Sequence, residues 1–302
     1  MPSRLFAAAV VLCGFALPAF AAPTVELIDA GSGAKTSLVL APKVGADESM
    51  EMVLDLVVGM DMGGESPKVT DAPPVKMVLK GKVVEKTPEG NYRYDFTLTD
   101  AGIEPYEIKV EMSDARRKEI DAINAQVREQ AEKYRGTRGT LVVDAHGGLV
   151  SSRVDSPGEP FANLEKSLAH AMVPMPSEPV GVGAKWKAVD RVKESGLSLT
   201  QTITYTVKAI DAGHVELEME LAQAGDHDSF KMPNLPAGTK AELVGLASTG
   251  KGTAVVDLGR LLPRTTVLEQ DFESRVVVVK ENENMGMHIG MTMDMDLSIK
   301  RL

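Results

Sequence analysis

Methionine occupies nearly every second position of one stretch of the chain, NMGMHIGMTMDMDLSIK at residues 284–300. A thioether sulfur can bind Cu(I), and the same flexible side chain can line a surface that accommodates apolar partners of varying shape. Because side chains alternate between the two faces of a strand, these methionines fall on one face and the polar residues on the other. The stretch therefore offers either a soft-metal site or an adaptable apolar surface.

A second stretch early in the chain, MEMVLDLVVGMDM at residues 50–62, repeats this arrangement. Nine of the sixteen methionines lie in the two stretches, although leucine, isoleucine or valine would fill a static core with less flexibility. We therefore predict that the two strands line an apolar cavity or groove for a lipid or the acyl chain of a lipoprotein. The candidate lining residues are Met50, Met52, Met60, Met62, Met287, Met291, Met293 and Met295.

Two alternatives compete with this interpretation. Apolar stripes usually pack a core, which would make the protein a cell-envelope structural or interaction module. The methionines could also make a periplasmic Cu(I)-binding protein with His288 as an additional ligand. However, His288 has the opposite parity to the neighbouring methionines, and their alternation predicts burial rather than access for copper. We therefore expect no metal ion and no other cofactor.

Catalytic signatures are missing from the sequence. The five histidines form neither a His-Glu-x-x-His nor a His-x-His pair, and no Gly-x-Ser-x-Gly elbow or phosphate-binding Gly-x-x-x-x-Gly-Lys loop occurs. The triplet Asp226-His227-Asp228 is typical of a polar hairpin tip. With 43 acidic against 33 basic residues, the protein is acidic and should repel nucleic acid. We expect a noncatalytic binding or structural protein, and the sequence leaves its oligomeric state open.

The first residues have the composition of a secretory signal. Arg4 precedes an apolar run, and the small-residue site Ala19-Phe20-Ala21 predicts cleavage after Ala21, so we assign residues 1–21 to a signal peptide. The run is too short for a membrane span, and no transmembrane segment is expected. The mature protein would be periplasmic or extracellular. It would lack cysteine, because Cys13 is lost with the signal, and must be stabilised by its core.

The mature chain contains an internal repeat. GTLVVDAHGGL from Gly139 returns as GTAVVDLGRLL from Gly252, and NYRYDFTL from Asn91 matches HVELEMEL from His214 with the same alternation. KVGAD at residues 43–47 likewise matches GVGAK further on. The first copy is longer by about two dozen residues, which form a predicted helical insertion. The predicted units are a first β-repeat at 22–172 with a helix at 113–135, a linker at 173–185 and a second β-repeat at 186–302.

Strict alternation in both copies predicts half-buried antiparallel strands joined by glycine-containing turns. A second amphipathic helix is predicted in EPFANLEKSLAHAM, residues 159–172, before the proline- and glycine-rich linker. We expect a mainly β (α+β) fold with large curved antiparallel sheets from a duplicated β-unit. Two amphipathic helices should pack on one face, an arrangement reminiscent of the half-barrels of periplasmic lipoprotein carriers.

The motif that opens the second copy, MPSEPVGVGAKW at residues 175–186, carries a resemblance. Together with TITYTVKAIDAGHVELEM and GKGTAVVDLGRLLPRT further on, this Pro-x-x-Pro-Val-Gly-Val-Gly-Ala-x-Trp motif resembles an uncharacterised family of exported bacterial β-rich domains of unknown function. The resemblance implies export and a β-rich fold. It implies no activity, catalytic residue or cofactor.

Overall fold

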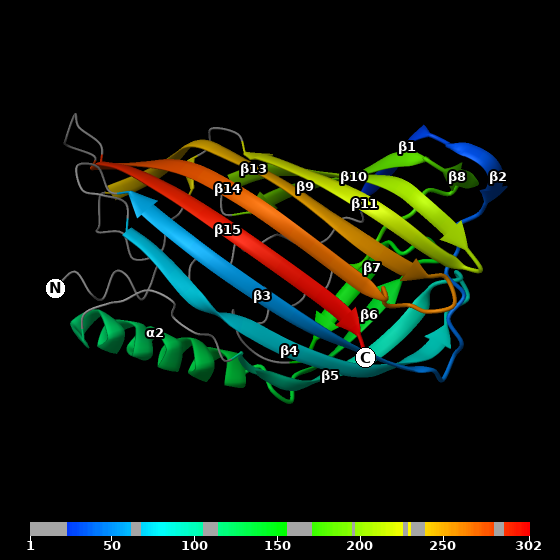
Figure 1. The fold of residues 1–302 in the computed structure, drawn as a ribbon, viewed down its shortest axis with the longest axis horizontal. Coiled ribbons are helices and arrows are strands. Elements are labelled where there is room, and N and C mark those ends of the chain that lie inside the picture. The colour runs from blue at the N-terminus through cyan, green and yellow to red at the C-terminus, as the bar shows by residue number, and fades with distance from the viewer. Residues whose placement is uncertain are drawn as a thin grey trace.

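The fold is described from a computed structural model over residues 23–61, 68–104, 114–155, 171–194, 197–225, 229–230, 239–280 and 287–302. Strands dominate this part of the chain (Figure 1). They are β1 (Thr24–Asp29), β2 (Ser32–Thr36), β3 (Asp47–Asp61), β4 (Lys68–Lys86), β5 (Tyr92–Ile103), β6 (Arg138–Val143), β7 (Leu149–Val154), β8 (Val180–Val182), β9 (Lys185–Glu194), β10 (Leu197–Asp211), β11 (His214–Gly225), β12 (Ser229–Phe230), β13 (Thr239–Asp257), β14 (Thr265–Lys280) and β15 (Met287–Arg301). The described helix is α2 (Asp114–Glu132).

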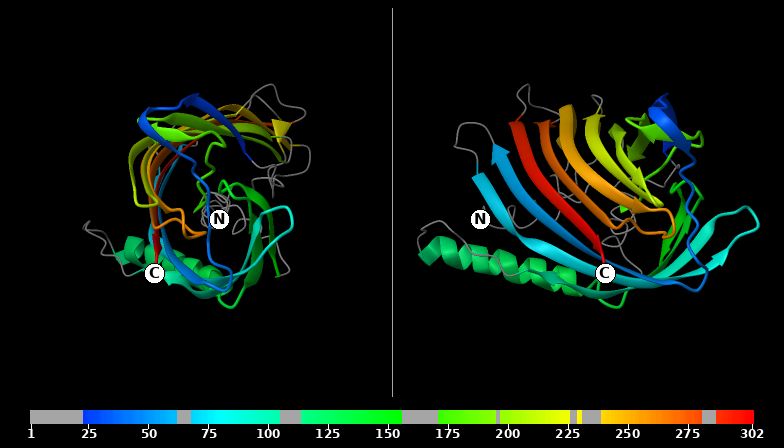
Figure 2. Two further views of the ribbon diagram at one scale, coloured as in Figure 1. Left: turned by 90° about the vertical axis from the view of Figure 1, so that its right-hand side faces the viewer. Right: turned by 45° about the vertical axis from the view of Figure 1, so that its right-hand side comes forward.

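Thirteen of these strands form a single antiparallel sheet. Its order is β1-β9-β10-β11-β13-β14-β15-β3-β4-β5-β6-β7, with β12 paired to β13, while β2 and β8 form a small second sheet. The large sheet curls into an incomplete ring (Figure 2). In the described residues its edge strands β1 and β7 each pair on one side only, so the ring is open. The prediction of a mainly β fold with a large antiparallel sheet is confirmed.

The strands form because apolar and polar residues alternate along them. In β11, Val215, Leu217 and Met219 are buried on the inner face, whereas Glu216 and Glu218 are exposed on the outer face. The same period of two continues in β14 and β15. Each strand therefore contributes one apolar row to the inside of the curl, and burial of these rows is the main stabilising contribution.

The sequence-matched stretches have the same register in the sheet. Phe96 of β5 is opposite Gly139 of β6, and Met219 of β11 is opposite Gly252 of β13. In both pairs a Cβ added to the glycine would lie less than 3 Å from the opposing side chain, so glycine makes room for it. The turns match too, since the Gly45 N–H donates to the Val83 carbonyl as the Gly183 N–H does to that of Val207. The matched stretches thus share their pairing, and the division into two β-repeats stays a prediction.

Trp186 lies at the centre of the main hydrophobic core. It is fully buried, its ring stacks on Tyr205 with centroids 5.4 Å apart, and its Nε1–H donates to the Pro174 carbonyl at 2.8 Å. Trp186 is therefore an anchor of this core. The core is completed by apolar residues from the connections between strands, namely Leu38, Leu40, Ala171, Met172, Val173, Met175, Leu261 and Leu262.

Helix α2 borders the sheet where β5 ends. It contacts β5 and β4 and continues the line of the sheet beside β4 (Figure 1). Ala131 is its buried residue, and Tyr134 in the following turn packs against the main core. The helix thus covers the sheet edge that β5 leaves open, and the packing of two helices on one face of the sheet stays a prediction. The second predicted helix lies outside the described residues, apart from Ala171 and Met172.

Candidate functional site on the inner face of the sheet

The two methionine-rich strands are neighbours in the sheet although they come from opposite parts of the sequence. β15 pairs with β3, with Met291 opposite Met60 and Met293 opposite Val58. Their shared face points into the curl, because Met293 is 7% exposed whereas Thr292 and Asp294 are exposed. The sulfur-bearing side chains of the two strands therefore belong to one continuous inner surface.

The candidate lining residues divide into two groups along this surface. Met50 and Met52 are 0% and 1% exposed and belong to the main core, where Met52 is opposite Ile299. Such burial is that of a packed interior, so the packed-core alternative describes these two residues better than a cavity lining. Met295 is half-buried and packs against the same core.

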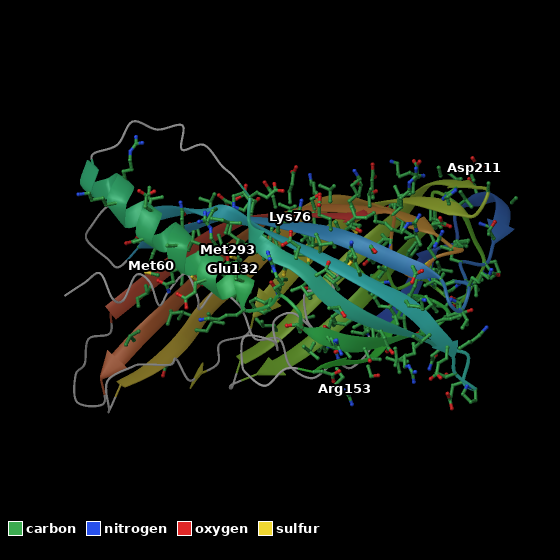
Figure 3. The ribbon with its side chains drawn as sticks, turned by 90° about the horizontal axis from the view of Figure 1, so that it is seen from below. Met60, Lys76, Glu132, Arg153, Asp211 and Met293 are labelled. Atoms are coloured by element: carbon green, nitrogen blue, oxygen red, sulfur yellow. The ribbon has the colours of Figure 1, made fainter. Side chains whose placement is uncertain are left out.

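The second group lies farther along the same strands. Met293 is buried and Met291 half-buried in a second apolar cluster, separate from the main core, and Met60, opposite Met291, is half-buried. Figure 3 shows Met60 and Met293 in the half of the molecule away from Asp211, at the tip of the β10–β11 hairpin. The side chains of Met62 and Met287 lie outside the described residues.

The second apolar cluster is built from strands alone. Its buried members are Val58, Leu199, Leu243, Leu246, Phe272, Val276 and Met293, and Leu56, Val278 and Met291 pack against them. These residues come from β3, β10, β13, β14 and β15, whereas connections between strands help to fill the main core. Among the described residues, the cluster is thus an apolar inner wall without the connecting segments that complete the main core.

A row of polar residues crosses the inner face beside this cluster. Asp190 of β9 is opposite Gln201 of β10, which is opposite Gln223 of β11, which is opposite Ser248 of β13. We call these four residues the polar row. None of the four was predicted from the sequence, although each stands at an otherwise apolar phase of its strand, as Gln223 does after Val215, Leu217, Met219 and Leu221.

Asp190 contributes a partly buried carboxyl to the polar row. Burial raises its pKa above the ordinary value of an aspartate, while a hydrogen bond from the Arg191 backbone N–H opposes this shift. A pKa raised by folding stabilises the fold at pH values below the unfolded-state pKa, and that stabilisation is lost as the pH rises through the folded-state pKa. At neutral pH the ionised carboxylate therefore lowers the stability of the fold.

Asp190→Asn should accordingly raise the melting temperature at pH 7 and lose this advantage at pH 3. The measurement is thermal unfolding followed by circular dichroism at both pH values. Asp294→Asn, the same change at an exposed outer-face position, controls for the loss of one negative charge. A lower melting temperature of Asp190→Asn at pH 7 would show that the carboxylate holds the fold together.

The outer face of the same strands is acidic. Asp296 of β15 lies between Glu269 of β14 and Asp55 of β3, and Asp271 is opposite Asp294. Nevertheless, no group of three or more His, Asp or Glu side chains that could hold a metal ion occurs among the residues described. His288 is exposed on this outer face, as its parity predicted.

A polar cleft lies between α2 and the edge of the sheet. Its charges are largely paired, with Lys76 Nζ 2.6 Å from Glu51 and 3.6 Å from Glu104, and with the Arg135 guanidinium 2.7 Å from Asp100. The two Lys76 pairs join β4 to β3 and to the residue after β5, and the Arg135 pair joins the turn after α2 to β5. The cleft is lined by Lys76, Asp100, Ala101, Gly102, Ile103, Arg128, Glu132 and Arg135.

No helix in the described ranges combines the length and apolar composition needed to cross a membrane. No family model and no curated protein matches the chain. Among solved structures, it is similar to OccAB4 of Acinetobacter baumannii at 7% identity, with 86% of this chain and 99% of that chain covered and a TM-score of 0.21.

Two other solved structures give similar values. The outer membrane protein OmpT of Vibrio cholerae is 5% identical, with 86% of this chain and 100% of that one covered and a TM-score of 0.20. OccK11 (OpdR) of Pseudomonas aeruginosa is 6% identical, with coverage of 89% and 99% and a TM-score of 0.20. Likeness at this level supports no conclusion about fold or function.

Proposed function

We propose that this protein is a noncatalytic, exported binding protein that takes up an apolar ligand, a lipid or the acyl chain of a lipoprotein, on the inner face of its curled sheet. The observation that carries the proposal is the second apolar cluster. Among the described residues, it combines Met293, Met291 and Phe272 in a wall formed by strands alone, apart from the packed core. Export rests on the predicted signal at residues 1–21.

The chemistry of the cluster suits a ligand of this kind. Burying an acyl chain is worth about 0.8 kcal/mol per methylene, so a chain of about ten carbons offers roughly 7 kcal/mol before the costs of association. Methionine side chains adapt to ligands of different shapes because they are unbranched and have several rotatable bonds. Leu199, Leu243 and Leu246 supply the more rigid part of the wall.

The test uses the neutral apolar dye N-phenyl-1-naphthylamine, whose fluorescence rises in an apolar site. We expect the double variant Met60→Gln/Met291→Gln to bind the dye at least tenfold more weakly than the native protein, because two directly opposed side chains become polar. Both are half-buried, so the fold should tolerate the change. Circular dichroism and the melting temperature verify folding.

Thr292→Gln is the matched control. It introduces the same side chain at the residue next to Met291, but on the exposed outer face of β15. It should leave dye binding unchanged. Native protein that does not bind the dye, or a double variant that binds it as well as native protein does, would contradict the proposal.

The packed-core module and the Cu(I)-binding protein remain alternative functions. Mass spectrometry of the protein purified from its own host separates them, because a bound lipid, a bound copper ion and an empty protein differ in mass. We expect a bound lipid. The burial of Met50 and Met52 supports the packed-core alternative for one part of the methionine surface.

A further inference from the structure

One continuous row of directly opposed residues crosses seven strands on the inner face. Its first half is the polar row on β9, β10, β11 and β13, and its second half, on β14, β15 and β3, belongs to the second apolar cluster. No register shift interrupts this part of the pairing. In order, the residues are Asp190, Gln201, Gln223, Ser248, Phe272, Met293 and Val58.

The parity of β9 and β10 places Asp190 and Gln201 on the inner face. Trp186 and Ala188, four and two residues before Asp190, are buried there, and Tyr205, opposite Trp186, shares the face with Gln201. Arg191, at the other parity, is exposed. Because the sheet is curled, the polar and apolar halves of the row line the same interior (Figure 2).

The side chains of the polar row differ in how many hydrogen bonds they already make within the sheet. Ser248 Oγ donates to the Asp271 carbonyl and accepts from Gln270 Nε2, both at 2.7 Å, so this end is satisfied within the sheet. No hydrogen bond joins the Gln223 amide to another described residue. The carboxylate of Asp190 accepts a backbone N–H from Arg191 and keeps further lone pairs for another donor.

The charges on this wall favour a cation. Asp190 is an acceptor when ionised. Among the described inner-face positions of β9, β10, β11, β13 and β14, the one lysine or arginine is Lys280, at the end of β14 and eight residues beyond Phe272. The carboxamide of Gln223 can accept a hydrogen bond from the same ligand group, and Gln201 lies between it and Asp190 in the row. An anionic head group would face a carboxylate in a partly buried site, where repulsion between like charges is stronger than in water.

We propose that the inner face binds a single-chain amphiphile with a cationic, hydrogen-bond-donating head group, the head at Asp190, Gln201 and Gln223 and the chain over Phe272, Met293 and Val58. This inference rests on the proposed function and names its ligand class. Directly opposed residues in a sheet are about 5 Å apart, so the row from Asp190 to Val58 spans roughly 30 Å along the curl. That is enough for a head group and an alkyl chain.

The experiment compares three ligands with the same ten-carbon chain, decylamine, decanol and decanoate, in displacing N-phenyl-1-naphthylamine at pH 7. We expect decylamine to displace the dye at a concentration at least tenfold lower than decanoate, with decanol between them. Asp190→Asn should reduce this preference at least fivefold, and Gln223→Leu should weaken decylamine binding. Asp294→Asn, which removes the same charge from the exposed outer face, should leave the preference unchanged.

Equal displacement by decylamine and decanoate would overturn the inference, as would an equal loss of preference in Asp190→Asn and Asp294→Asn. Either result would leave the proposed function intact, provided that native protein binds the dye and Met60→Gln/Met291→Gln binds it at least tenfold more weakly. Native protein that does not bind the dye at all would instead contradict the proposed function itself. The measured melting temperatures of Asp190→Asn and Gln223→Leu ensure that only folded protein is compared.

Discussion

Trp186→Ala should lower the free energy of unfolding by roughly 3–5 kcal/mol, the usual cost of removing a buried large aromatic side chain. The indole is fully buried, stacks on Tyr205 and donates to the Pro174 carbonyl. The variant therefore leaves a cavity in the main core and an unsatisfied carbonyl. Chemical denaturation followed by circular dichroism measures the change.

Trp186→Phe is the informative comparison. It keeps an aromatic ring against Tyr205 but removes the Nε1–H donor. We therefore expect it to lower the free energy of unfolding by about half as much as Trp186→Ala does, or less. If the phenylalanine variant were as unstable as the alanine variant, the hydrogen bond to Pro174 would dominate rather than packing. If the alanine variant kept native stability, Trp186 would have no role as the core anchor.

Glu48→Ala should lower the free energy of unfolding by roughly 3–5 kcal/mol, because it leaves two buried backbone donors without a partner. Glu48 is 3% exposed, and its carboxylate accepts the Leu261 N–H at 3.0 Å and the Leu262 N–H at 2.9 Å. The two leucines belong to the main core. Glu48 thus ties the connection after β13 to β3, which lies more than 200 residues earlier in the chain.

Glu48→Gln tests the same contact with less disturbance, since its carbonyl oxygen can still accept one of the two N–H groups. We expect Glu48→Gln to lower the free energy of unfolding less than Glu48→Ala does, as measured by denaturant unfolding. Glu51→Ala is the matched control. Glu51 lies three residues after Glu48 in the same strand, but on the outer face, where it pairs with Lys76. A Glu48→Ala protein as stable as Glu51→Ala would refute a structural role for the carboxylate.

The sequence was sufficient to predict individual strands and the inner face of each one. Alternation carried this information, as the burial of Val215, Leu217 and Met219 shows. The repeated motifs also anticipated which positions are equivalent, since Phe96 meets Gly139 as Met219 meets Gly252. These features depend on neighbours close in sequence or on local steric constraints, which a pattern records directly.

The candidate site was only partly predictable, because it depends on which strands are neighbours. Sequence parity placed Met60 and Met293 on inner faces, but it could not show that β15 pairs with β3. It also could not separate Met52, in the core, from Met60, in the second cluster, since both have the same phase. The polar row was missed for the same reason, as Asp190, Gln201 and Gln223 become neighbours only through register.

The pairing of β15 with β3 has a consequence for how the protein is made. The two strands meet at the middle of the sheet, yet more than 200 residues of chain separate Met60 from Met291. Contacts between such distant segments form late, because a long loop must close first. β15 must therefore be in place before the two halves of the sheet can join, and until then β3 and β14 expose unpaired sheet edges, which are templates for pairing with other chains.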